Sequence, residues 1–161
     1  MLVEKRLGLE EANRVIAAVI EAAKERGSQL AVAIVDQHGD LIAGGCRMDG
    51  RPYRFMKAAW RKAYSAAAFD MDTSGIIQFW DRQQAEGHRG PADWNDSMLT
   101  TLPGGYAIIY DGKMVGGIAV AGGGGGEGRG DWDYVAIGLQ ALGEGFTHAE
   151  SMFRYTPEYD A

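Results

Sequence analysis

Hydrophobic residues near the start of the chain recur with the spacing of an α-helix. Over residues 9–26 they return at every third or fourth position, which places them on one helical face, and Gly27 is typical of a C-terminal cap. The apolar run 30–35 then predicts a strand. Residues 41–45 predict its hairpin partner, because the intervening residues include turn-forming Asp and Gly.

Two more helices, a second hairpin and a final helix follow. The predicted elements are helices over residues 53–69 and 75–86, strands over 106–110 and 114–121, and a last helix over 131–146. Asp111-Gly112 favours a two-residue hairpin turn, and the small, nearly continuous apolar return strand predicts burial on both faces. Ser74 and Asp131 are placed to act as helix N-caps.

This order of elements predicts an α+β fold, an antiparallel β-sheet with helices packed on it. We expect one domain over residues 1–161, with a core at about 7–146 and a polar tail from 147 to 161.

Composition narrows the classes of function. The 161 residues are 46% hydrophobic and 24% charged, and the net charge of −6 comes without a basic block, which argues against nucleic acid and anionic membranes as partners. The N-terminus lacks the apolar segment of a signal peptide, and no 18-residue apolar window could span a bilayer. A single cysteine, Cys46, fits a reducing compartment, so we expect a cytoplasmic protein.

Nine glycines lie between residues 116 and 130. Gly123, Gly125 and Gly128 formally satisfy the dinucleotide-binding spacing, but that fingerprint requires a parallel βαβ unit, which this order of elements does not provide. What remains is a helix N-terminus that could hold an anion, with Asp131 competing for the same amides.

Several segments together resemble the GlcG/HbpS-like family, which also occurs at the C-terminus of PduO-type proteins. The matching segments are Leu9-Glu10-Glu11-Ala12, Ala33-Ile34-Val35-Asp36, Met48-Asp49-Gly50, Lys62-Ala63-Tyr64-Ser65-Ala66 and the stretch 102–142, so the resemblance covers about residues 7–145. It implies a profilin-like α/β sandwich, usually a symmetric oligomer. Several members of the family bind haem, in some cases through a histidine of the first helix.

Lys62 is the first candidate site residue. It either packs its stem against the core with its ammonium paired to Asp36 or Asp49, or lies beside a pocket as a base or anion clamp. Arg47 and Asp49 cluster where the chain leaves the first hairpin. In an enzyme, Lys62 and Asp49 would be the acid–base pair and Arg47 the anion clamp.

The candidate ligand-binding residues surround a predicted pocket between the second helix, residues 102–105 and the glycine-rich loop. They are Gly104, Gly105, Gly123, Gly124, Gly125 and Asp131, together with Trp94 and His88 on a polar segment that could fold over a planar ligand. His38, His88 and His148 have no metal-type spacing, so no metal site is predicted. Haem is possible by resemblance, and the absence of a histidine from residues 9–26 argues against it.

The sequence therefore favours two functions, and a purely structural or accessory assembly role is a third candidate. The first is a cytoplasmic, oligomeric small-molecule-binding protein whose ligand is an aromatic or carboxylated metabolite, or a tetrapyrrole. The alternative is a cofactor-independent isomerase, lyase or hydrolase acting on a small organic acid or aromatic compound.

Overall fold

The computed structural model describes residues 1–47, 54–90 and 94–149. The helices are α1 (Leu9–Glu25), α2 (Arg54–Phe69), α3 (Thr73–Ala85) and α4 (Asp131–Leu142). The strands are β1 (Leu30–Asp36), β2 (Leu41–Arg47), β3 (Gly105–Tyr110), β4 (Lys113–Ala121) and β5 (Phe146–His148). The described strands form one sheet in the order β2-β1-β4-β3-β5, with every neighbouring pair antiparallel, so the predicted α+β fold is confirmed.

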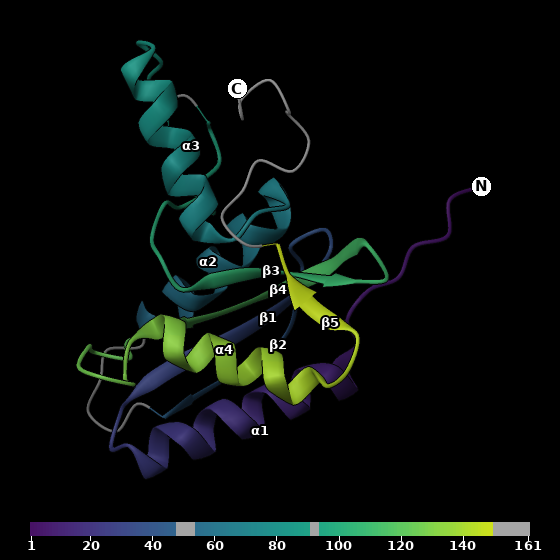
Figure 1. The fold of residues 1–161 in the computed structure, drawn as a ribbon, viewed down its shortest axis with the longest axis vertical. Coiled ribbons are helices and arrows are strands. Elements are labelled where there is room, and N and C mark those ends of the chain that lie inside the picture. Colours follow the sequence, from purple (N-terminus) through teal and green to yellow (C-terminus); the bar gives the residue numbers. More distant parts are fainter. Residues whose placement is uncertain (48–53, 91–93, 150–161) are drawn as a thin grey trace.

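Helices cover both faces of this sheet. α1 and α4 lie side by side on one face, α2 lies on the other, and α3 projects from the body (Figure 1). β1 shows why both faces are filled: Leu30, Val32 and Ile34 belong to the core under α1 and α4, whereas Ala31 and Ala33 pack against α2. All seven residues of β1 are buried.

Small residues let α2 lie unusually close to the sheet. Ala59, Ala63 and Ala66 of α2 are fully buried against the strands. A Cβ atom added to Gly117 of β4 would lie 2.5 Å from the carbonyl oxygen of Ala63, so only glycine allows this approach. The close packing carries Lys62 of α2 to the end of β4.

The predicted hairpin turn is confirmed, and two predicted helix caps are corrected. Asp111 and Gly112 both have positive φ angles, 52° and 71°, as the predicted hairpin turn requires. α3 begins at Thr73 with Asp72, not Ser74, as its N-cap, and α4 has Gly130 rather than Asp131 in the cap position.

The end of the chain differs most from expectation. α4 ends at Leu142 rather than near Phe146, because Gly143 and Gly145 adopt φ angles of 91° and 88° that end the helix. Residues 146–148, partly assigned to a polar tail, form β5 and pair with β3.

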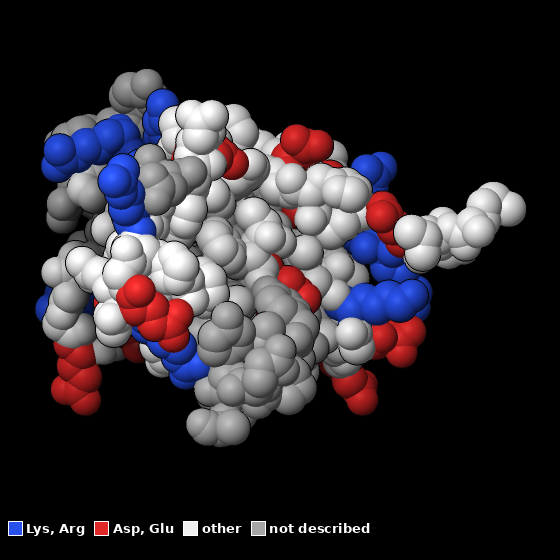
Figure 2. Space-filling view, turned by 90° about the horizontal axis from the view of Figure 1, so that it is seen from above, with Lys and Arg blue, Asp and Glu red and all other residues white. Residues whose placement is uncertain are grey.

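Seen from the α3 end, acidic and basic side chains are interspersed with uncharged ones over the surface (Figure 2). The N-terminal segment projects to one side, where Met1, Leu2 and Val3 are exposed. None of the helices in the described ranges is long and apolar enough to cross a bilayer.

Candidate functional site

A cavity of about 410 Å³ opens where the glycine-rich loop passes the turn between α1 and β1. It is lined by residues 27–29, by Gly123, Gly124 and Gly125, and by Arg129. The register of the sheet explains this meeting. Ala31 of β1 pairs with Ala121 of β4, so the residues before one strand lie beside those after the other. We call this space the glycine-loop cavity.

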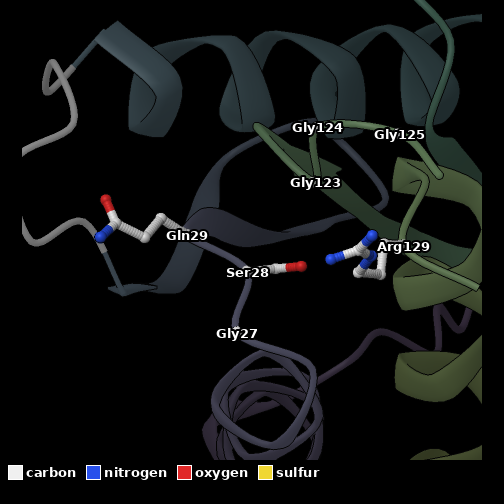
Figure 3. A pocket seen from close by; sticks show the side chains of 7 residues that line it. All are labelled: Gly27, Ser28, Gln29, Gly123, Gly124, Gly125 and Arg129. Carbon is white, nitrogen blue, oxygen red and sulfur yellow. The ribbon is translucent and has the colours of Figure 1, made fainter.

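The polar groups of the glycine-loop cavity favour an anion. The side chains of Arg129 and Ser28 point toward each other across it, whereas Gln29 points away (Figure 3). No acidic residue lines the cavity, and no described carboxylate lies within ion-pair distance of Arg129. Ser28 is fixed from behind, since its hydroxyl oxygen accepts a hydrogen bond of 2.5 Å from Tyr134.

Glycine is required in the loop itself. Gly124 and Gly125 have φ angles of 91° and 85°, which side chains rarely tolerate. A Cβ atom on Gly123 would lie 2.8 Å from the carbonyl oxygen of Arg129. The backbone can therefore form a wall of the cavity in a conformation that residues with side chains rarely adopt.

A buried ion pair anchors the entry to this loop. Lys62 Nζ donates to Asp131 Oδ2 at 2.7 Å and to the carbonyl oxygen of Val120 at 2.9 Å, with only 5% of the lysine side chain exposed. The other Asp131 oxygen accepts the amide hydrogen of Gly123 at 2.8 Å. Lys62 is thus paired to Asp131, not to Asp36 or Asp49, and the Asp131 carboxylate faces the loop instead of capping α4.

Gly104 and Gly105 belong to this anchor and not to the cavity lining. A Cβ atom on Gly104 would lie 2.7 Å from Cβ of Asp131 and 3.3 Å from Lys62 Nζ. Gly105 donates its amide hydrogen to Thr73 Oγ1 at 3.0 Å. Both glycines allow the segment before β3 to lie against α2.

The remaining predicted residues lie elsewhere. His88 and Trp94 line a separate hollow of about 220 Å³ beside α3, together with Trp80. Asp49 lies outside the described residues. Arg47 ends β2, and its side chain lies outside the described part of the structure.

Sequence reasoning missed Arg129 and Ser28 as site residues. An arginine flanked by glycines, Gly128-Arg129-Gly130, was the available signal, because a cation on an open loop often serves a ligand. No local signal marks Ser28, since its place in the site depends on the pairing of β1 with β4.

A second buried polar cluster was also missed. His148 of β5 and Asp72, the N-cap residue of α3, make a 2.5 Å contact between Nδ1 and Oδ2, and the other Asp72 oxygen accepts from the amide of Ala107 at 3.0 Å. The His148 ring stacks on Tyr106 with centroids 4.0 Å apart. Burial raises the pKa of Asp72 from its ordinary 3.8 to about 6, although the hydrogen bond from His148 opposes the rise. These contacts tie α3, β3 and β5 together.

The model of the family described as "Haem degrading protein HbpS-like" matches residues 7–130, which is most of the chain. The chain belongs to the HbpS-like family. None of the curated proteins matches it.

Solved structures agree on the fold. The crystal structure of Klebsiella pneumoniae protein ORFY superposes with a TM-score of 0.75 at 22% identity, over 88% of this chain and 94% of that one. The crystal structure of a double mutant of Streptomyces reticuli HbpS superposes with a TM-score of 0.73 at 29% identity, over 89% of this chain and 92% of that one. The crystal structure of a PduOC:heme complex superposes with a TM-score of 0.69 at 26% identity, over 84% of this chain and 94% of that one.

The two larger cavities among the described residues offer a haem iron few donors. Haem iron needs a strong axial donor such as His, Cys, Met or Tyr. α1 contains no histidine, and His, Cys and Met are absent from the lining of both the glycine-loop cavity and a second cavity of about 610 Å³ beside the N-terminal segment. Tyr110 lines that second cavity with its ring packed on Phe146, at 4.6 Å between centroids.

None of the three histidines lines either of the two larger cavities. His38 Nε2 lies 3.2 Å from Glu4 at an exposed turn, and His148, whose Nδ1 contacts Asp72, belongs to the cluster beside β5. The hollow beside His88, at about 220 Å³, is smaller than the roughly 300–1,000 Å³ of ordinary ligand pockets. Within residues 1–47, 54–90 and 94–149, no three His, Cys, Asp or Glu residues group closely enough to hold a metal ion.

Proposed function

We propose that this protein binds a small carboxylated metabolite in the glycine-loop cavity. The observation that carries the proposal is the Arg129 guanidinium, which faces a cavity of about 410 Å³ that no acidic residue lines. That volume lies within the range of about 300–1,000 Å³ that small-molecule sites occupy. A guanidinium that faces such a cavity favours an anionic ligand, and a carboxylate matches its paired N–H groups.

The surrounding groups have separate tasks in this proposal. Arg129 supplies the charge and the bidentate geometry, and Ser28 supplies a hydroxyl on the opposite side of the cavity. Lys62 and Asp131 do not touch the ligand but hold Gly123 in place. The carboxylate is favoured over the aromatic alternative, because the lining of the cavity contains no aromatic side chain.

Membership of a family described as haem degrading, and the likeness to a PduOC:heme complex, support binding of a small molecule in general. No His, Cys or Met lines either of the two larger cavities, so we do not propose haem as the ligand. Assembly as a homo-oligomer and a cytoplasmic location complete the proposal. The single cysteine, Cys46, exposed and free, supports that location.

The alternative acid–base enzyme draws no specific support from Lys62. Its ammonium already donates to Asp131 and to the Val120 carbonyl, and 5% of its side chain is exposed. A general base needs access to the proton that it abstracts.

Titration of the ¹⁵N-labelled protein with succinate tests the proposal. We expect amide shifts concentrated at residues 27–29 and 123–129, and much weaker shifts with succinamide, the uncharged diamide of the same size. Equal shifts with both probes, or shifts spread evenly over the surface, would contradict a carboxylate site.

A further inference from the structure

The second cavity, of about 610 Å³, has a different chemistry from the glycine-loop cavity and shares no lining residue with it. It lies between the N-terminal segment, the start of α1 and the adjoining ends of β3 and β5. Its apolar lining comprises Leu7 and Val115, both 2% exposed, and the rings of Tyr110 and Phe146, which are in contact and tilted by 38°. It could enclose the apolar body of a small ligand.

The two cations that line this cavity each have an acidic partner outside it. Lys5 pairs with Asp111 at 3.1 Å, and Arg6 lies 3.9 Å from Asp36. Neither aspartate lines the cavity. Both cations are therefore partly compensated before a ligand binds.

Of the three acids that line the cavity, two also have partners outside it. Glu4 contacts the side chains of Gln37 and His38, Gln37 being uncharged. Glu11 accepts the Gly8 amide hydrogen at 2.9 Å and has only Arg14, at 3.8 Å, as an ion-pair partner.

Glu144 is the third acid of the lining. It is exposed at the cavity, and among the described residues no cation lies within ion-pair distance of it. With three acids and two cations, the lining has a formal net charge of −1.

Carboxylates beside aromatic faces are the chemistry that recognises ammonium groups. Tyr110 shows this attraction within the molecule, because Lys5 Nζ lies 5.3 Å from the centre of its ring. We propose that this cavity binds a small organic cation, an amine on an apolar or aromatic body, with Glu144 and Glu11 facing the charge and Tyr110 and Phe146 facing the body.

Benzylamine and the uncharged, similarly shaped benzyl alcohol are the probes. We expect benzylamine to shift the amide signals of Leu7, Val115 and Phe146 and to bind at least about fivefold more tightly than benzyl alcohol. Glu144→Gln, an exposed substitution that leaves the fold intact, should weaken benzylamine about threefold to tenfold and leave benzyl alcohol unchanged. Glu21→Gln, an exposed change on α1 remote from the lining, is the matched control.

Two outcomes would overturn the inference. One is the absence of shifts at these residues at about 10 mM benzylamine. The other is equal binding of both probes with no effect of Glu144→Gln, which would make the site merely apolar. Neither outcome bears on the carboxylate site, because the two cavities share no residue.

Discussion

Lys62 Nζ lies 2.7 Å from Asp131 Oδ2, and this contact joins α2 to the first residue of α4. Through its other oxygen, Asp131 also holds the amide of Gly123, so one buried ion pair fixes the start of the glycine-rich loop. The shape of the glycine-loop cavity therefore depends on a lysine that does not line it.

Replacing Lys62 should destabilise the protein strongly. Lys62→Met removes one partner of a largely buried pair and leaves the Asp131 carboxylate uncompensated, so we expect the free energy of unfolding to fall by about 3 kcal/mol. Lys57→Met, at an exposed position of the same helix, should change it by less than about 0.5 kcal/mol. Urea denaturation measures both, and equal effects would show that the pair contributes little.

Asp72 should make stability depend on pH. Its pKa in the folded chain, about 6, lies above the ordinary 3.8, so the folded state binds this proton more tightly than the unfolded state. The resulting contribution to the free energy of unfolding is complete below about pH 4 and is lost as the pH rises through about 6.

Asp72→Asn removes this titration. The unfolding free energy of the wild type relative to the variant should therefore fall by up to roughly 3 kcal/mol between about pH 4 and pH 7. Asp81→Asn, exposed on α3, should keep the wild-type profile. Parallel profiles for the wild type and Asp72→Asn would disprove this assignment.

Assembly can be tested directly in solution. β2 is an outer strand of the sheet, its residues before Arg47 are uncharged, and Leu41 at its start is 42% exposed. Sheet edges of this kind favour pairing. We expect a closed homo-oligomer that buries more than about 1,000 Å² per contact. Light scattering at micromolar concentration measures the mass, and a monomer there would refute the expectation.

Haemin should bind weakly if it binds at all. Because no histidine lines either of the two larger cavities, titration should give a shallow absorbance change without a sharp six-coordinate spectrum. Tight binding of one equivalent per subunit would contradict this, and loss of that binding in His88→Ala or His38→Ala would identify the ligand.

Local sequence patterns predicted the helices and strands better than they predicted which of these elements lie next to one another. The hairpin at Asp111-Gly112 was predictable because two adjacent residues set the turn. The pairing of β1 with β4 joins residues that lie far apart in the sequence, and no local signal specifies it. That pairing creates the glycine-loop cavity, so the sequence indicated the glycines but not Ser28.

The same limit explains His148. After two glycines a short polar segment is typical of a tail, and only its pairing with β3 and its contact with Asp72 make it part of the fold. Ion pairing of Lys62 was one of the alternatives from the sequence, but its partner was not predictable, because Asp131 reaches it only after α2 and α4 have packed on the sheet.

Comparing succinate affinity between the wild type and Arg129→Gln tests the central claim most directly. Isothermal titration calorimetry should show affinity at least about tenfold weaker for Arg129→Gln, because hydrogen bonds to a charged group contribute about 1.5–3 kcal/mol. Arg89→Gln, in the hollow beside α3, should bind like the wild type. Equal affinities for all three proteins, or no measurable binding to the wild type, would contradict a carboxylate site in the glycine-loop cavity.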